Sequence, residues 1–204
     1  MTQNERPTII DFVEKYTHQF AQNVYLREKV DGAWTEITQE QTRKTAHKIG
    51  AGLMALGLEK GDKIALLSES RAMWILAELG AMYAGATDVP LSVNLGSAAD
   101  LLFRIHHSDT KWILVSANHL ARIREIMPEC PDVKKVIVFD DNAFNIDSLQ
   151  EGEIKMSEVI SMGVDFLAKD REAFVKRYSS IGPDDYANIS YTSGTTADPK
   201  GILL

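Results

Sequence analysis

Cysteine is nearly absent from the sequence: Cys130 is the only one, so the chain cannot form a disulfide with itself. This excludes the small secreted domains that disulfides hold together and fits a reducing compartment, so we expect the protein in the cytoplasm. Long hydrophobic runs are also lacking, because the longest apolar stretch, Trp74 to Leu91, is interrupted by Glu78 and Asp88. That stretch is too short and too charged for a transmembrane segment. The polar first residues likewise lack the apolar region of a signal peptide.

Excess positive charge is missing as well. The chain has 22 Lys and Arg residues against 29 Asp and Glu residues, which gives a net charge of −7. A nucleic-acid-binding protein needs a basic face, so we expect no nucleic-acid partner. In other respects the composition is that of an ordinary globular protein, with 45% hydrophobic and 25% charged residues among 204, enough to bury a core.

What the sequence does contain is an alternation of short apolar runs with stretches of helical periodicity. The apolar runs predict buried strands, and they are Lys63–Leu67, Thr87–Leu91, Trp112–Val115 and Val133–Phe139. Helical stretches lie between them. This order predicts an α/β fold, with a mostly parallel, doubly wound sheet and flanking helices.

Two further regions surround this alternation. Before it, Thr8–Phe20 has the spacing of an amphipathic helix, Asp31-Gly32 predicts the turn of an N-terminal β-hairpin, and Thr38 begins a capping-box pattern. After it, residues 140–152 are interpreted as a loop and Glu153–Tyr178 as one long charged helix. A final short strand is expected to follow this helix.

The most informative segment lies near the end of the sequence, where Tyr191–Gly201 combines two glycines, a Ser/Thr cluster and one lysine. Small residues let backbone N–H groups converge on an anion, hydroxyls add hydrogen bonds, and a lysine supplies the countercharge, so this composition predicts a phosphate-binding turn. It is not a Walker A loop, because Lys200 precedes Gly201 and no Ser or Thr follows it directly. The candidate phosphate-binding residues are Thr192, Ser193, Gly194, Thr195, Thr196, Lys200 and Gly201.

This segment resembles the AMP-binding signature of the adenylate-forming superfamily, which holds acyl-CoA synthetases, luciferases and the adenylation domains of peptide synthetases. It matches the pattern Tyr-Thr-Ser-Gly-Thr-Thr-Gly-x-Pro-Lys-Gly at every fixed position but one, where Ala197 replaces a glycine. If that position needs a positive φ, alanine is strained there by about 1 kcal/mol. The resemblance implies that Lys200 and Thr195 act catalytically by stabilising charge on the phosphates of ATP. It also implies Mg²⁺, with ligands outside this chain, and coenzyme A as a co-substrate.

The resemblance covers nearly the whole chain, whereas members of the superfamily run to several hundred residues. We therefore expect residues 1–204 to be the N-terminal portion of the large AMP-binding domain, ending just after the phosphate-loop signature. The remaining large domain and the C-terminal domain would be absent, and such a fragment should be inactive alone. Residues 202–204 should be too few to extend into a strand beyond the turn, which would leave Thr192–Leu204 flexible.

Within the superfamily, Arg27–Trp34 and Glu69–Trp74 are similar to long-chain fatty-acid CoA ligases. Such a parent enzyme activates a fatty acid with ATP to acyl-AMP and transfers the acyl group to coenzyme A, and peripheral association with a membrane fits its substrate. Two alternatives stay open. The chain could belong to an adenylation domain for an amino or aryl acid, or it could be a stand-alone module that binds a nucleotide or a partner without catalysis.

No metal site is predicted. His106 and His107 are neighbours, but adjacent helix residues point about 100° apart and cannot readily chelate one ion. Cys130 lies between two prolines and is interpreted as an ordinary loop cysteine. Asp140 and Asp141 are interpreted as part of a turn rather than as a catalytic carboxylate pair.

Overall fold

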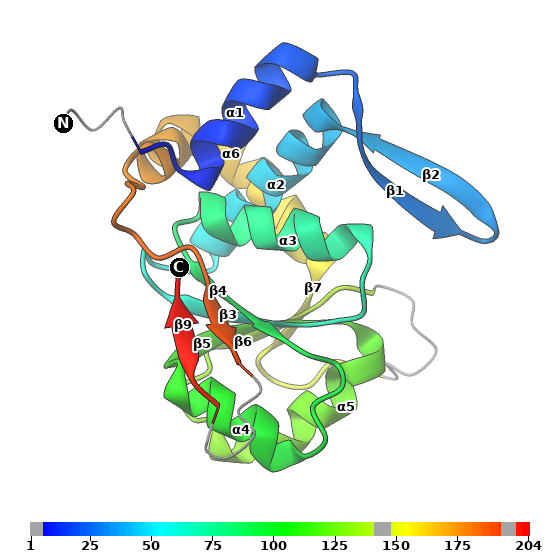
Figure 1. The fold of residues 1–204 in the computed structure, drawn as a ribbon, viewed down its shortest axis with the longest axis vertical. Coiled ribbons are helices and arrows are strands. Elements are labelled where there is room, and N and C mark those ends of the chain that lie inside the picture. Colours follow the sequence, from blue (N-terminus) through cyan, green and yellow to red (C-terminus); the bar gives the residue numbers. More distant parts are fainter. Residues whose placement is uncertain (1–5, 141–147, 193–198) are drawn as a thin grey trace.

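The computed structural model describes residues 6–140, 148–192 and 199–204. Its centre is a five-stranded parallel sheet with the strand order β4-β3-β5-β6-β7. Helices cover both faces of this sheet (Figure 1), so the predicted doubly wound α/β fold is confirmed. The strands are β3 (Lys63–Leu67), β4 (Thr87–Leu91), β5 (Thr110–Val115), β6 (Lys135–Val138) and β7 (Glu153–Lys155).

The two faces of the sheet have separate hydrophobic cores. Ile64 and Leu66 of β3 pack against α2, α3 and α6, whereas Ala65 and Leu67 pack against α4 and α5. Because β3 is buried on both faces, it appears in the sequence as a continuous apolar run. The helices are α1 (Ile9–Phe20), α2 (Gln39–Ala55), α3 (Ala72–Tyr83), α4 (Ala98–His107), α5 (Ala117–Ile126) and α6 (Met156–Ser179), with the 3-10 turn η2 (Met127–Glu129) after α5. None of the helices in the described parts of the chain is long and apolar enough to cross a membrane.

The N-terminal elements form as predicted. Helix α1 begins at a capping box made by Thr8 and Asp11, and α2 begins at the predicted capping box. Strands β1 (Val24–Val30) and β2 (Ala33–Thr38) form the predicted hairpin. Its turn contains Gly32 at a φ of 84°, a left-handed conformation that glycine adopts without strain.

The prediction is wrong at the start of α6. The segment predicted as one helix first forms the edge strand β7, and α6 begins only at Met156. The carboxylate of Glu153 accepts hydrogen bonds from the Arg124 guanidinium at 2.8 and 2.7 Å, so a charged side chain is satisfied beside the sheet. A three-residue strand that contains Glu153 and Lys155 has no apolar alternation, which is why its sequence did not reveal it.

Glu14 connects α1 to the helices behind it. Its carboxylate accepts hydrogen bonds from the Tyr83 hydroxyl at 2.6 Å and from Arg43 at 2.7 Å, and His47 Nε2 lies 3.1 Å away. Burial alone would raise the pKa of Glu14, but the hydrogen bonds from His47, Arg43 and Tyr83 outweigh it and hold the pKa far below its usual range. The ionised carboxylate therefore stabilises the packing of α1.

We expect Glu14→Gln to lower the free energy of unfolding at pH 7 by about 1–3 kcal/mol, because the amide cannot satisfy three donors. A carboxyl with a lowered pKa in the folded state contributes stability above its unfolded pKa of about 4.3, and this contribution is lost as the pH falls toward the folded value. The difference in free energy of unfolding between wild type and Glu14→Gln should therefore shrink between pH 5 and pH 2.

Urea unfolding across this pH range measures that difference. Glu40→Gln is the control, since Glu40 pairs with Lys44 at the surface. Equal stability of wild type and Glu14→Gln at pH 7 would contradict this assignment.

Candidate functional site

A β-hairpin closes the base of the candidate phosphate-binding segment. Strands β8 (Ile189–Tyr191) and β9 (Gly201–Leu203) pair antiparallel on either side of it. One step beyond this pairing, the Thr192 N–H donates a hydrogen bond to the Lys200 carbonyl at 3.1 Å. The structure thus brings together the two ends of the predicted site.

Of the predicted phosphate-binding residues, the structure describes Thr192, Lys200 and Gly201. Lys200 is exposed and so is accessible to a ligand in solution. The catalytic roles of Thr195 and Lys200 stay predictions. The residues of the segment that lie outside the described parts of the chain include Ser193, Gly194, Thr195, Thr196 and Ala197.

The expectation that no strand forms beyond the turn is wrong. Gly201–Leu203 is strand β9, and Leu204 and Asn188 exchange backbone hydrogen bonds of 2.9 and 3.2 Å just past it. Gly201 allows β8 and β9 to approach closely, because a Cβ at that position would lie only 3.1 Å from the Ile189 side chain. Three residues suffice here because their partner strand lies directly across the turn.

Helix α4 holds the hairpin through the first residue of the signature. The Tyr191 hydroxyl lies 2.8 Å from His107 Nδ1, and the Arg104 guanidinium lies 5.5 Å from the centre of the Tyr191 ring. Burial raises the pKa of the Tyr191 hydroxyl, which keeps it protonated. In Figure 1 the hairpin lies next to α4. Sequence reasoning missed this contact, because no local pattern joins residues that are 84 positions apart.

The adjacent histidines have separate partners. His106 Nε2 lies 2.8 Å from the Glu129 carbonyl oxygen, whereas His107 faces Tyr191. This separation agrees with the geometric argument against a shared ion. Within the described ranges, no three His, Cys, Asp or Glu side chains are grouped so that they could hold a metal ion.

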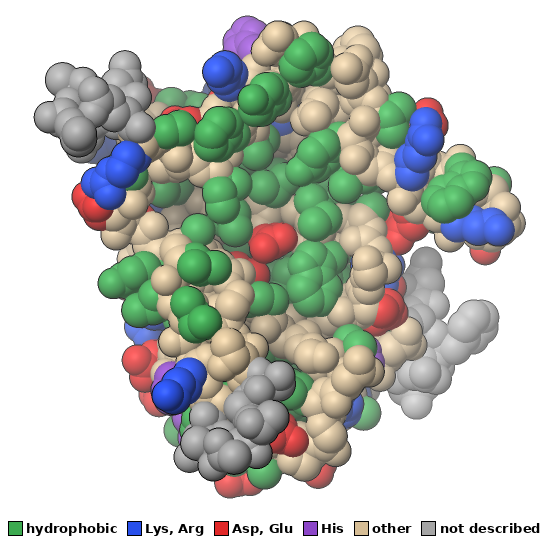
Figure 2. Space-filling view, viewed as in Figure 1, with side chains coloured by type: hydrophobic (Ala, Val, Ile, Leu, Met, Phe, Trp, Pro, Cys, Tyr) green, Lys and Arg blue, Asp and Glu red, His purple; other side chains and the backbone are tan. Residues whose placement is uncertain are grey.

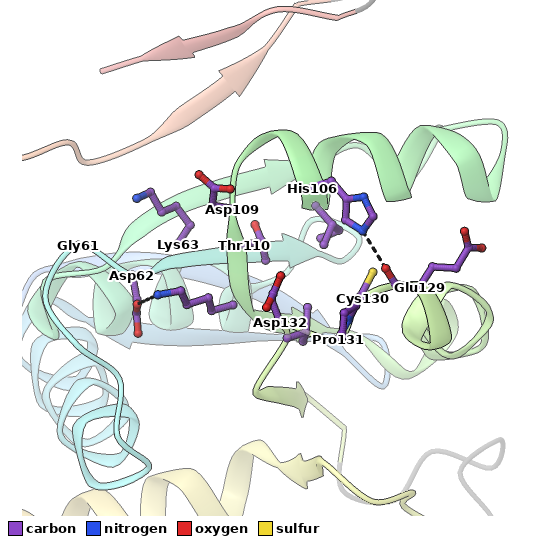
Figure 3. A pocket seen from close by; sticks show the side chains of 13 residues that line it. Gly61, Asp62, Lys63, His106, Asp109, Thr110, Glu129, Cys130, Pro131 and Asp132 are labelled. Atoms are coloured by element: carbon purple, nitrogen blue, oxygen red, sulfur yellow. Dashed lines mark hydrogen bonds and ion pairs between the residues drawn. The ribbon is translucent and has the colours of Figure 1, made fainter.

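A cavity of about 590 Å³ lies at the amino-terminal ends of β3 and β5 (Figure 3). Its walls carry charges of both signs, including Lys63, Asp109 and Asp132. Cys130 also lines it, but this thiol is buried and burial raises its pKa, so it is a poor nucleophile at neutral pH. Such a mixed lining does not select a phosphate group.

A polar cluster at the opposite, carboxyl-terminal edge of the sheet was not predicted. The strand order reverses between β3 and β5, and α/β proteins commonly bind ligands beside such a reversal. There the Glu69 carboxylate accepts hydrogen bonds from Ser116 Oγ at 2.6 Å and Asn118 Nδ2 at 2.7 Å. Burial would raise the pKa of Glu69, but these hydrogen bonds outweigh it and lower the pKa. The carboxylate is therefore ionised at neutral pH.

Asp140 stands beside this cluster and has a defined structural role. It accepts a hydrogen bond from the Ala117 N–H at 2.9 Å, at the start of α5, and pairs with Arg71 at 2.7 Å. Asp140 thus fixes the beginning of α5, which is a more specific role than the predicted turn. Asp141 lies outside the described residues.

Comparison with known proteins identifies the family. The family described as "AMP-binding enzyme" matches residues 13–204. The peroxisomal long chain acyl-CoA synthetase 6 of Arabidopsis thaliana is 29% identical over 204 residues, which cover 97% of this chain and 28% of that protein. Fatty acyl-CoA synthetase A of Dictyostelium discoideum is 29% identical over 174 residues, covering 85% of this chain and 25% of that protein. The chain thus spans only 25–28% of the length of these relatives.

Solved structures show the same fold. The anthranilate CoA ligase AuaEII, in complex with anthranoyl-AMP, superposes with a TM-score of 0.77 at 21% identity, covering 100% of this chain and 36% of that one. Coronafacic acid ligase from Pectobacterium brasiliense gives a TM-score of 0.70 at 20% identity, covering 94% of this chain and 33% of that one.

Proposed function

The chain belongs to the AMP-binding enzyme family, and from this premise we propose that it is the N-terminal portion of a long-chain fatty-acid CoA ligase. The relatives named above support this assignment, since two of them are acyl-CoA synthetases. The parts that would complete the large domain and add a C-terminal domain are proposed to lie outside residues 1–204.

The proposed reaction has two steps. A fatty carboxylate attacks the α-phosphate of ATP and pyrophosphate leaves, which gives acyl-AMP. The thiol of coenzyme A then attacks the acyl carbon and releases AMP. In the first step Lys200 would offset negative charge on the β- and γ-phosphates, and Thr195 would donate a hydrogen bond to a phosphate oxygen. Ser193, Thr196 and the backbone at Gly194 would complete the cradle.

Mg²⁺ would accompany ATP and neutralise part of the phosphate charge. The proposal places its ligands outside this chain, as the resemblance to the adenylate-forming superfamily implies. The contribution of this chain is then limited to binding and orienting the phosphates through hydroxyls, N–H groups and one ammonium.

One observation carries the proposal: the signature is bracketed by a paired hairpin. The Thr192–Lys200 backbone hydrogen bond of 3.1 Å closes the loop at its base. The paired strands therefore hold Thr192 and Lys200, at the two ends of the signature, close to each other. A loop of this composition, closed in this way, suits an anion with several oxygens.

We expect the full-length protein to catalyse ATP–pyrophosphate exchange that depends on palmitate. Parallel assays with anthranilate and with a mixture of amino acids test the aryl-acid and amino-acid alternatives. The 204-residue chain alone should give no exchange above a blank without enzyme, because adenine, ribose and magnesium contacts would be missing. Exchange with an amino or aryl acid but not with palmitate would overturn the fatty-acid assignment. Exchange by the 204-residue chain would contradict the proposal that this chain is an incomplete part of the enzyme.

A further inference from the structure

Strand β8 directs alternate side chains to opposite sides of the β8–β9 hairpin. Ile189, on the inner side, is 6% exposed and belongs to the hydrophobic core beneath α4 and α5. Ile202, which pairs with Ser190 on the outer side, is 47% exposed, and Figure 2 shows hydrophobic side chains at the surface over this hairpin. Tyr191 lies two positions after Ile189, so its ring is also on the inner side and packs against the same core.

The Tyr191 side chain contacts two residues of α4 that are three positions apart and so lie on one face of the helix. The hydroxyl oxygen of Tyr191 is 2.8 Å from His107 Nδ1 and 3.4 Å from the Arg104 carbonyl oxygen. The Arg104 guanidinium lies 5.5 Å from the centre of the Tyr191 ring, within the range of a cation–π contact. The His107 ring meets the Tyr191 ring edge-on, with centres 5.6 Å apart. Both the ring and the hydroxyl of Tyr191 are therefore held by α4.

The two side chains of α4 are themselves fixed by residues one turn earlier in the helix. Arg104 is 8% exposed, and its Nη1 donates a hydrogen bond to the Asp100 carbonyl at 2.7 Å. The His107 ring stacks on Phe103, with centres 5.3 Å apart and planes inclined by 26°. Side chains that are already held in place lose little conformational entropy when they bind a partner. Helix α4 thus offers a preformed site for the Tyr191 side chain.

Tyr191 in turn holds the backbone on both sides of Lys200. It pairs with Gly201 across the hairpin, and a Cβ at Gly201 would lie 3.5 Å from the Tyr191 ring, so the ring packs against this glycine. The residue after Tyr191 is Thr192, whose N–H donates to the Lys200 carbonyl at 3.1 Å. The backbone of Lys200 therefore follows the position of Tyr191.

We propose that His107 is a positioning residue for adenylation, because its contact with the Tyr191 hydroxyl sets the place from which the Lys200 ammonium reaches the phosphates of ATP. This inference rests on the proposed function, which gives Lys200 its role at the phosphates. His107 acts through Tyr191 and touches neither ATP nor the fatty acid. A two-stranded hairpin is only marginally stable by itself, so without this contact Lys200 is correctly placed in a smaller fraction of molecules. The rate of adenylation falls in proportion to that fraction.

Single-turnover formation of acyl-AMP by the full-length protein, with ATP and palmitate, tests this role. Tyr191→Phe removes only the hydroxyl and keeps the ring, whereas His107→Ala removes the partner of the hydroxyl. Each should lower the rate by about 2- to 10-fold, the range expected for the loss of one hydrogen bond. The double variant should be no slower than His107→Ala, because both changes remove the same contact. His107→Asn should recover most of the rate, since its amide oxygen can accept from the Tyr191 hydroxyl.

His106→Ala is the matched control, because this histidine is adjacent on α4 but contacts the Glu129 carbonyl oxygen. It should react at the wild-type rate. The rate and the amplitude of the single turnover separate positioning from folding. A variant that is partly unfolded forms less acyl-AMP, but its folded molecules react at the wild-type rate.

Several results would overturn the positioning role of His107. They are wild-type rates in Tyr191→Phe and His107→Ala, independent losses that multiply in the double variant, no recovery in His107→Asn, an equal loss in His106→Ala, and a loss of amplitude alone. Lys200→Ala, measured in parallel, separates this inference from the proposed function. A slow Lys200→Ala beside a wild-type rate in His107→Ala would overturn the positioning role alone, whereas a wild-type rate in Lys200→Ala would overturn both.

Discussion

Gly163→Ala should lower the free energy of unfolding by about 3 kcal/mol or more, the largest effect on stability that we expect from a single added methyl group. Gly163 is where α6 meets α2, and a Cβ there would overlap the carbonyl group of Lys48. It would also lie 2.9 Å from the backbone nitrogen of Gly52. Both obstacles are backbone atoms inside a helix, so neither can move without separating the helices.

Helix propensity alone predicts the opposite sign, since alanine is about 1 kcal/mol better than glycine within a helix. Urea unfolding followed by circular dichroism therefore distinguishes the two effects. Gly96→Ala is the matched control, because nothing lies within 4 Å of a Cβ at that position and its stability should be nearly unchanged. A Gly163→Ala protein that is as stable as wild type would show that α2 and α6 do not approach as described.

Lys200→Ala should reduce adenylation by the full-length protein by about 10²–10³-fold, or about 2.7–4 kcal/mol, as expected for the loss of one preorganised charge contact in the transition state. Thr195→Ala should also reduce the rate through loss of a phosphate hydrogen bond. Single-turnover formation of acyl-AMP measures both variants directly. Both effects should appear mainly in the rate of acyl-AMP formation, because the phosphate charge is redistributed in the transition state.

Lys169→Ala is a suitable control, since Lys169 is an exposed lysine on α6 in the same chain. Its rate of acyl-AMP formation should match that of wild type. If Lys200→Ala and Thr195→Ala also keep the wild-type rate, the signature is structural and the phosphate assignment is wrong.

Much of the fold could be predicted because its signals are local. Strands β3 and β4 have the predicted bounds, since continuous burial requires continuous apolar residues. Capping boxes at Thr8 and Thr38 depend on residues three positions apart, and the Thr38 pattern could be recognised in the sequence. Strand β7 could not be predicted in this way, because its residue Glu153 is charged and is satisfied by Arg124 from a distant helix.

The same distinction between local signals and long-range contacts applies to the candidate site. The signature was recognisable because its chemistry lies within one short segment. Its attachments were not, since Tyr191 meets His107 and Asn188 meets Asp88 across long stretches of chain. The donors to Glu69 likewise come from a different strand end. Contacts of this kind depend on the strand order, which the sequence pattern restricts without specifying.

The central claim, that this chain supplies the phosphate-binding part of an acyl-adenylating enzyme, is tested most directly by an isotope transfer. The full-length protein is given palmitate labelled with ¹⁸O in its carboxylate, together with ATP and coenzyme A. Attack of a carboxylate oxygen on the α-phosphate, followed by thiol attack on the acyl carbon, leaves that oxygen on AMP. The account predicts AMP that carries ¹⁸O, detected by mass spectrometry. Unlabelled AMP, or label in ADP or orthophosphate, would contradict it.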